Sequence, residues 1–339
     1  MGSLSCDIER ILGGKVSPQE LLTPISSQFK RPKVIVLSGP TCSGKSALAM
    51  MLAEEIGGEI VSADSTQVYR GLNVGTAKPT EREMKAIPHH LVDVLDIHES
   101  FNVVDFHLAA SHTCQLILNK GGVPIVVGGT GFYIHSLIYG PPQGPTPDPK
   151  IRARLEGQFD LQGADWMYER LEQLDIDYAK TITCHDRQKI IRALEIIEIT
   201  GGKVSELKWR EAQIPKLFDF RCWFLNRPKS ILYDRINSRC EKMVAKGLLQ
   251  EVSLLDQMGL RENTSASSAI GYRQSLEFLD SPQTKEDFDH FMETFKRASR
   301  RYAKRQLTWF RREPLFEWID LDLHDPETAI ELIMRDLES

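Results

Sequence analysis

The sequence lacks long apolar runs, paired cysteines and a recognisable targeting segment. No stretch of 18 apolar residues occurs, so we expect no membrane-spanning helix and no membrane partner. The six cysteines are scattered without a C-x-x-C pair, which predicts free thiols rather than disulfides or zinc ligands. The N-terminus shows neither a secretory signal nor an Arg-rich transit pattern. We expect a monomer in the cytoplasm, with an organelle left open.

Strand-like and helix-like segments alternate through the first 140 residues. "KVIVLSG", "EIVSAD", "HHLVDVLDI" and "VPIVVGGTG" read as strands, mostly with the β-branched content of buried parallel strands. The helix "KSALAMMLAEEIGG" should stop at Gly57, and another should run from an Asn102 cap to Gly121. Thr80 and Glu83 predict a capping box. This alternation predicts a parallel α/β sheet.

A glycine-rich segment follows the first predicted strand and precedes the first helix. It reads G-P-T-C-S-G-K-S and matches G-x-x-x-x-G-K-[ST]. Such a loop turns backbone N–H groups toward phosphate oxygens, the lysine adds a positive charge, and the final hydroxyl can ligate Mg²⁺. The sequence therefore predicts a phosphate-binding loop made of Gly39, Pro40, Thr41, Cys42, Ser43, Gly44, Lys45 and Ser46, with Ser46 as a Mg²⁺ ligand. The loop alone leaves a kinase or another nucleotide-hydrolysing protein open.

The proline-rich segment "PPQGPTPDP" at 141–149 interrupts the alternation and marks a domain boundary. Residues from 151 to about 216 read as helical, and "FDFRCWFL" reads as a strand that returns to the sheet. We predict an α/β fold with a P-loop parallel-sheet core and an inserted all-helical domain. The predicted parts are an N-terminal extension (1–32), a catalytic core (33–140 and 218–322), the inserted domain (141–217) and a C-terminal helix (323–339).

Six blocks of sequence carry a resemblance to a known family. In chain order they are "GPTCSGKS", "SADSTQVYRGLNVGTAKPT", "PHHLVDVL", "VVGGTGFYI", "AIGYRQ" and "YAKRQLTWFRR", and they resemble the tRNA dimethylallyltransferases. The resemblance implies transfer of the dimethylallyl group from dimethylallyl diphosphate to N6 of adenosine 37 in tRNA, with release of diphosphate. It also implies that the loop holds the donor's diphosphate with Mg²⁺, and that the inserted domain grips the anticodon stem.

The resemblance assigns catalytic roles to Asp64, Thr130, Lys45 and Arg235. Asp64 would be the general base, because an exocyclic adenine amine is a poor nucleophile that needs a positioned carboxylate. Lys45 and Arg235 would contact the diphosphate, with Arg239 a weaker candidate, and Thr130 would lie near the reacting amine. The structural alternatives are a turn-forming Asp64, a helix-capping Thr130 and surface-exposed arginines.

The net charge is −5, so RNA binding would require a local basic patch. Residues 296–312 supply one, with eight lysines and arginines, no acid and interleaved aromatics. The resemblance implies tRNA contacts at Asp64, Ser65, Thr66, Gln67, Arg152, Asp186, Gln188, Ser268, Gly271, Tyr272, Arg273, Lys304, Arg305, Gln306, Trp309 and Arg311. The chain departs from the family at "DRQK" (186–189), where relatives carry D-P-Q-R.

Two other activities remain open at this stage. An adenylate isopentenyltransferase would share the loop and Asp64, but a free nucleotide would not need the basic helix. A small-molecule kinase would also share the loop. A non-catalytic RNA-binding module would not need an intact phosphate loop together with Asp64.

Overall fold

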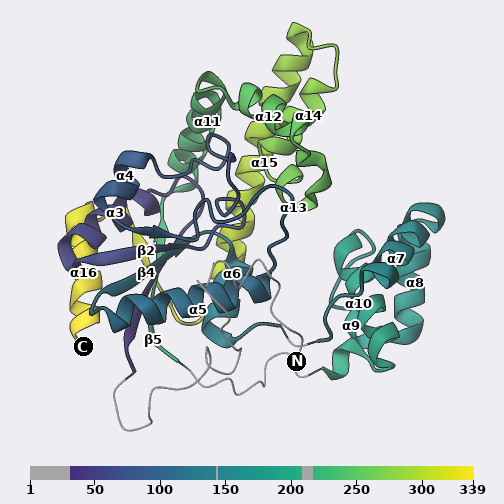
Figure 1. Cartoon of the computed structure of the whole chain (residues 1–339), viewed down its shortest axis with the longest axis horizontal. Coiled ribbons are helices and arrows are strands. Elements are labelled where there is room, and N and C mark those ends of the chain that lie inside the picture. The colour runs from purple at the N-terminus through teal and green to yellow at the C-terminus, as the bar shows by residue number, and fades with distance from the viewer. Residues whose placement is uncertain (1–30, 143, 208–216) are drawn as a thin grey trace. The chain divides into compact units, whose positions relative to one another are not determined.

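The computed structural model describes residues 31–142, 144–207 and 217–339. These residues divide into two compact units, one with residues 31–139 and 217–339, the other with residues 140–142 and 144–207. Figure 1 shows the sheet of the first unit and the helices of the second. Within the described residues, no helix combines the length and apolarity needed to cross a bilayer.

The first unit is built on a six-stranded sheet in which every neighbouring pair is parallel. The strand order is β3-β2-β4-β1-β5-β6. Because parallel strands need crossover connections, helices separate them along the chain. The strands are β1 (Lys33–Ser38), β2 (Gly58–Ser62), β3 (His89–His90), β4 (Val123–Gly128), β5 (Asp219–Asn226) and β6 (Phe316–Asp320).

Helices cover both faces of this sheet. Ile35 and Leu37 of β1 pack on the face covered by α3 (Lys45–Ile56) and α16 (Pro326–Glu338), while Val34 and Val36 pack on the opposite face. Burial on both faces explains why the strands read as continuous apolar runs. The remaining helices of this unit are α4 (Glu81–Ala86), α5 (Val103–Asn119), α6 (Gly131–Tyr139), α11 (Lys229–Ala245), α12 (Leu248–Gln257), α13 (Thr264–Ser267), α14 (Tyr272–Leu279), α15 (Lys285–Phe310) and the 3₁₀ turn η2 (Leu260–Glu262).

Local capping signals set several helix ends as predicted. α3 ends at Gly57, whose φ of 62° is the left-handed conformation that glycine adopts without strain. The Thr80 hydroxyl accepts from the Glu83 N–H, and the Glu83 carboxylate accepts from the Thr80 N–H, so the predicted capping box is present. Asn102 caps α5 in the same reciprocal way with Asp105.

The prediction of a strand through "HHLVDVLDI" is wrong beyond its first two residues. β3 stops at His90, and Leu91 and Asp93 take positive φ angles of 59° and 54°. These conformations cannot continue a pleated strand, so the chain turns and only Leu95 makes an isolated bridge, to Tyr69. The sequence did not predict β6, an edge strand in which only Phe316 and Ile319 are buried.

The second unit is helical and has its own core. Leu155, Met167, Leu171, Ile190 and Leu194 are among its buried apolar residues. Together with the parallel sheet, these helices confirm the predicted fold class, a P-loop α/β core with an inserted all-helical domain. The elements are α7 (Pro149–Gln162), α8 (Ala164–Leu174), α9 (Ile176–Ala179), α10 (Arg187–Thr200) and the 3₁₀ turn η1 (Val204–Glu206).

Candidate active site

Three predicted groups meet at the carboxyl edge of the sheet. The phosphate loop follows β1, Asp64 follows β2, and Thr130 follows β4. β2, β4 and β1 are neighbours in the sheet, so their ends lie side by side. The crevice outside the carboxyl ends of parallel strands is where ligands bind in open α/β sheets.

The phosphate loop wraps the N-terminus of α3. Gly44 has a φ of 108°, a conformation that a side chain would strain, and a Cβ at Gly39 would lie 2.6 Å from the Leu225 carbonyl oxygen. Within the described chain, the N–H groups of Gly44, Lys45 and Ser46 donate to no protein acceptor. These groups and the helix dipole create a site suited to an anion.

Side chains from distant parts of the chain fix the outside of the loop. The Arg235 Nε donates to the Cys42 carbonyl at 2.9 Å, and the Arg227 Nε donates to the Ser43 carbonyl at 2.9 Å. Arg227 also binds the Leu321 carbonyl and the Asp322 carboxylate beyond β6. The loop is therefore preorganised before any ligand arrives.

Gln306 joins the loop to the end of β4. Its Oε1 accepts from the Thr41 N–H at 2.8 Å, and its Nε2 donates to the Gly129 carbonyl at 2.9 Å. The side chain is buried, and a Cβ at Gly129 would collide with it. We predicted Gln306 to contact tRNA, and the structure instead places it inside the protein between two parts of the site.

Gln306→Ala should lower the free energy of unfolding by about 1–3 kcal/mol, because it removes the acceptor of the Thr41 N–H and the shorter of two hydrogen bonds to the Gly129 carbonyl. Urea denaturation measures this change. Lys304→Ala, an exposed position on the same helix, is the matched control and should stay within about 0.5 kcal/mol of wild type. Equal stability of the Gln306→Ala and Lys304→Ala proteins would contradict the bridging role.

Positive charges concentrate beside the loop. Burial, and next the charge of Arg239, lower the pKa of Lys45 to about 8, against the opposing effects of Asp64 and Cys42. The Arg239 Nη1 donates to the Thr41 hydroxyl at 3.2 Å. Arg239 lines the cavity described below, whereas Arg235 is exposed and grips the loop backbone. Both arginines therefore contact the loop, and Arg239 lies on the cavity side.

Asp64 presents one carboxylate oxygen to the protein and leaves the other available. Its Oδ1 accepts from the Thr66 N–H at 2.9 Å and from the Thr66 hydroxyl at 2.6 Å. Within residues 31–142, 144–207 and 217–339, its Oδ2 makes no hydrogen bond. The turn therefore orients the carboxylate and keeps a lone pair free to accept a proton.

Tyr302 of α15 connects Asp64 with Thr130. Burial, and next the Asp64 charge, raise the pKa of Tyr302 to about 12, while hydrogen bonds to Thr130 and Gln306 lower it. Its hydroxyl also lies 3.5 Å from the Gly129 carbonyl. Tyr302 therefore lines the cavity together with Asp64 and contacts Thr130.

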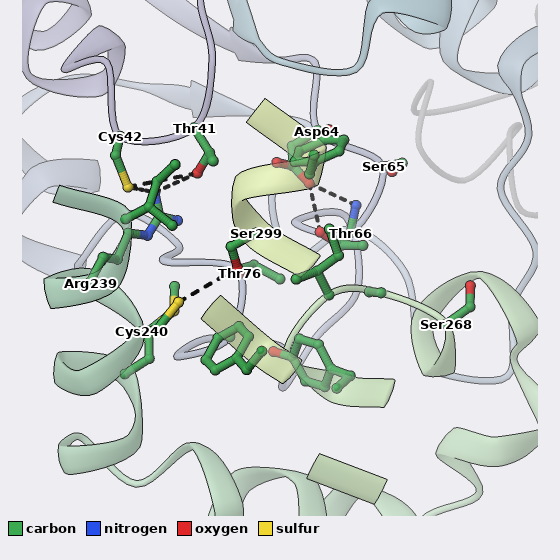
Figure 2. Close-up of a pocket in the computed structure, with 18 of the residues that line it drawn as sticks. Thr41, Cys42, Asp64, Ser65, Thr66, Thr76, Arg239, Cys240, Ser268 and Ser299 are labelled. Atoms are coloured by element: carbon green, nitrogen blue, oxygen red, sulfur yellow. Dashed lines mark hydrogen bonds between the residues drawn. The ribbon is translucent and has the colours of Figure 1, made fainter. Parts of the chain in front are cut away.

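A cavity of about 310 Å³ lies among several of these groups, and its lining includes Thr41, Cys42, Asp64, Arg239 and Tyr302. Figure 2 shows Thr41, Cys42 and Arg239 on one side, and Asp64 and Thr66 on the other. The cavity combines polar groups at the sheet edge with an apolar wall. That wall includes Ile236, Met243, Ala269, Ile270 and Phe295.

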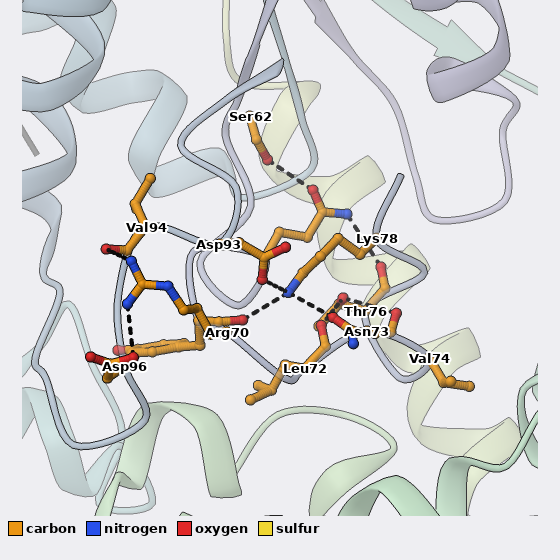
Figure 3. A network of polar contacts seen from close by, with 12 residues as sticks. Ser62, Arg70, Leu72, Asn73, Val74, Thr76, Lys78, Asp93, Val94 and Asp96 are labelled. Carbon is orange, nitrogen blue, oxygen red and sulfur yellow. Dashed lines mark hydrogen bonds and ion pairs between the residues drawn. The ribbon is translucent and has the colours of Figure 1, made fainter. Parts of the chain in front are cut away.

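Two charged side chains, Glu251 and Lys78, hold the segment of residues 69–78, which contributes Gly75 and Thr76 to the cavity lining. The Glu251 carboxylate accepts from three successive N–H groups, at 73–75, and from the Tyr272 hydroxyl at 2.6 Å. The Lys78 ammonium donates to the Tyr69 carbonyl, to Asn73 and to the Asp93 carboxylate (Figure 3). Burial lowers the pKa of Lys78, and the Asp93 hydrogen bond opposes this. Sequence reasoning found neither Glu251 nor Lys78.

The other residues predicted to bind tRNA fall into three groups. Those that line the cavity are Ser65, Thr66, Ser268, Tyr272 and Arg305. Those that are exposed are Gln188, Arg273, Lys304, Trp309 and Arg311. Those engaged by other protein groups are Gln67, which accepts from Ser62, and the buried Gly271. In the helical unit, the partly exposed Asp186 accepts from the Thr183 N–H, and the partly exposed Arg152 pairs with the buried Glu195 at 2.7 Å.

Ser46 is the loop hydroxyl whose place in the motif suits Mg²⁺. Ser46 is exposed at the second residue of α3, beside Lys45. Among the described residues, no group of three or more His, Cys, Asp or Glu side chains could hold a metal ion. Mg²⁺ is commonly bound by few protein ligands together with substrate phosphates and waters. The donor set therefore fits an ion that arrives with a phosphorylated ligand.

A parallel sheet that feeds a glycine-rich loop into a helix N-terminus defines a P-loop α/β protein. The family model described as "IPP transferase" matches residues 67–313. The chain belongs to the IPP transferase family, as the six sequence blocks predicted.

Curated relatives match nearly the whole chain. A tRNA dimethylallyltransferase from Protochlamydia amoebophila is 52% identical over 100% of this chain and 99% of its own length. A protein of the same name from Chlamydia abortus is 45% identical over 93% of this chain and 90% of its own.

Solved structures of tRNA-modifying transferases also match this chain. A tRNA isopentenylpyrophosphate transferase from Bacillus halodurans is 36% identical, with a TM-score of 0.66 over 91% of this chain and 97% of that one. A eukaryotic dimethylallyltransferase described as acting on tRNA is 28% identical, with a TM-score of 0.75 over 91% of this chain and 80% of that one.

Proposed function

We propose that the protein is a tRNA dimethylallyltransferase that modifies N6 of adenosine 37 with dimethylallyl diphosphate as the donor. The observation that carries this proposal is a cavity lined by Thr41 and Cys42 of the phosphate loop on one side and by Asp64 on the other. A phosphoryl-transfer enzyme could also use the loop and an aspartate, but the apolar wall of the cavity suits the five-carbon chain of a prenyl donor. The names of the relatives favour tRNA over a free adenine nucleotide.

The reaction follows from the placement of these groups. The N6 nitrogen attacks the first carbon of the dimethylallyl group, the C–O bond to diphosphate breaks, and the N6 proton passes to Asp64. The loop N–H groups, Lys45 and Arg239 stabilise the negative charge that grows on the leaving diphosphate. Arg235 and Arg227 keep the loop in the shape that this requires.

We propose Mg²⁺ as the cofactor, which Ser46 would hold when the phosphorylated donor is bound. When bound, it neutralises part of the charge on the leaving group. We also propose that the enzyme acts as a monomer. Because tRNA is the proposed substrate, we propose the cytoplasm as its site of action.

A competition between acceptors tests this function. Labelled dimethylallyl diphosphate is mixed with the protein and with tRNA, AMP and ATP together. We expect label in tRNA alone. Label in AMP or ATP would instead indicate an adenylate isopentenyltransferase, and phosphate transfer from ATP would indicate a kinase.

The exposed cations of α15 should dominate the salt dependence of tRNA binding. Replacing Lys304 and Arg305 together by alanine should weaken binding and reduce the slope of log affinity against log salt by about 1–2, since two phosphate contacts are lost. Filter binding at several salt concentrations measures the slope. The matched control replaces Lys85 and Lys120, two exposed lysines outside α15, by alanine and should keep the wild-type slope. The same slope in both double variants would remove α15 from the RNA surface.

A further inference from the structure

Two aromatic side chains are exposed together near the cavity. Phe132 of α6 is 45% exposed and Trp309 of α15 is 39% exposed. Their ring centroids lie 6.4 Å apart in an edge-to-face arrangement. α6 and α15 pack against each other in the catalytic unit (Figure 1). Large exposed aromatic rings are unfavourable in water, so a contiguous pair indicates a binding surface.

The Trp309 ring is held in place by Gly131 and His135 of α6. A Cβ on Gly131 would lie 2.4 Å from Trp309 Cδ1, so the ring rests directly on the glycine backbone. The His135 ring lies edge-on to Trp309 at a centroid distance of 6.3 Å, and His135 Nδ1 is 2.9 Å from the Glu313 carboxylate. A ring held in this way can bind a flat ligand with little loss of side-chain freedom.

The surface beside this aromatic pair is positively charged. Lys304, Arg305, Arg311 and Arg312 are exposed and form no ion pair within the part of the chain that the structure describes. The carboxylate next to the pair, Glu313, is held by His135. Unpaired cations around exposed rings match a partner that has both negative charge and flat faces. Single-stranded RNA has phosphates and unstacked bases in this combination.

The aromatic pair lies one helical turn from the cavity. Arg305 lines the cavity, and Trp309 follows it by four residues on α15, so the two side chains share one helix face. Gly131 and Phe132 directly follow Thr130, which lies next to Tyr302 in the site. A nucleotide inside the cavity would therefore have its neighbour in the strand near the two rings.

We propose that Phe132 and Trp309 form a stacking platform for the unpaired base adjacent to the adenosine that enters the cavity, with Arg305 at the phosphate between the two nucleotides. The proposal rests on the proposed function, because it needs an RNA substrate. Extruding the target base unstacks its neighbour, and the platform replaces that lost stacking. Trp309 was predicted from the sequence to bind tRNA, whereas Phe132 was not.

The test compares anticodon stem-loop RNAs with and without the neighbouring base. Three RNAs are used: the complete stem-loop, and two that carry an abasic nucleotide on the 5′ or the 3′ side of the target adenosine. Phe132→Ala should weaken binding of the complete RNA by about tenfold, the worth of one stacked base. For one of the two abasic RNAs, Phe132→Ala and wild-type protein should bind equally. Phe132→Leu keeps apolar area without a ring and should lose most of the same affinity.

Controls separate stacking from folding and from the proposed function itself. Leu254→Ala truncates an exposed apolar side chain on α12 and should bind all three RNAs like wild type. When 2-aminopurine replaces the neighbouring base in the RNA, stacking on the rings of the wild-type protein should quench its fluorescence. Phe132→Leu should restore that fluorescence. The same loss on all three RNAs, or no loss on the complete one, would overturn the platform. If wild-type protein modifies no RNA, the proposed function fails instead.

Discussion

Asp64→Ala should lower the turnover number by about 10²–10⁴-fold while tRNA binding stays near the wild-type level, since a positioned general base contributes this much. The carboxylate sits at the end of β2 with one oxygen bound by Thr66 and the other available. Loss of the proton acceptor should therefore affect the chemical step rather than binding. Single-turnover transfer and equilibrium tRNA binding measure the two separately.

Asp64→Asn provides the matched control. The amide oxygen can still accept from the Thr66 N–H and hydroxyl, so the turn should be preserved, but the amide cannot take a proton. A loss of similar size in both variants identifies the carboxylate as the base. A rate near wild type in Asp64→Asn would show that this side chain only shapes the turn.

Lys45→Ala should lower the turnover number by about 10²–10³-fold, the usual cost of removing one donor that stabilises transition-state charge. Lys45→Arg should retain more activity because the positive charge remains. The difference between these two variants measures the contribution of charge at this position.

The lowered pKa of Lys45 also predicts how the affinity for diphosphate depends on pH. Only the protonated lysine attracts the anion. Because the pKa of Lys45 is about 8 before diphosphate binds, the affinity of the protein for diphosphate should fall as pH rises through about 8. Arginine stays protonated throughout this range. Calorimetric titration of inorganic diphosphate between pH 7 and 9 should therefore show a steeper loss in wild type than in Lys45→Arg. Identical pH profiles would mean that Lys45 does not titrate in the site.

Local signals in the sequence predicted much of the fold. Gly57 ends α3 through its own backbone conformation, and Thr80 caps α4 through Glu83, three residues away. Both roles depend on local sequence alone, so the sequence could predict them. The strand predicted through residues 89–97 failed because burial in a turn can produce the same apolar spacing as a strand. β6 was missed because its solvent-facing residues interrupt the apolar run.

The site was only partly predictable. The loop and Asp64 are carried by short motifs, whereas Arg227 holds the loop from 184 positions away and Glu251 holds residues 73–75 from 176 to 178 positions away. No periodicity in the sequence reports such contacts. They appear only when the strands bring distant segments to the same edge of the sheet.

Gln306 is different, because a signal for its burial was present. From Phe295 onward, the buried residues of α15 are Phe295, Ser299, Ala303, Gln306 and Phe310, at helical spacing. This periodicity places Gln306 on the core-facing side of the helix, away from the exposed lysines and arginines. The resemblance to a family assigned it to the RNA surface together with its neighbours in sequence, and helix geometry separates the two sets.

A crystal structure with an unreactive dimethylallyl diphosphate analogue and an anticodon stem-loop would show whether the loop holds the diphosphate of a prenyl donor while Asp64 faces the N6 amine of a tRNA adenine. We expect diphosphate oxygens against the loop N–H groups and Lys45, with N6 within hydrogen-bond distance of Asp64. A nucleoside triphosphate in that loop, with its terminal phosphate directed at an acceptor, would rule this arrangement out.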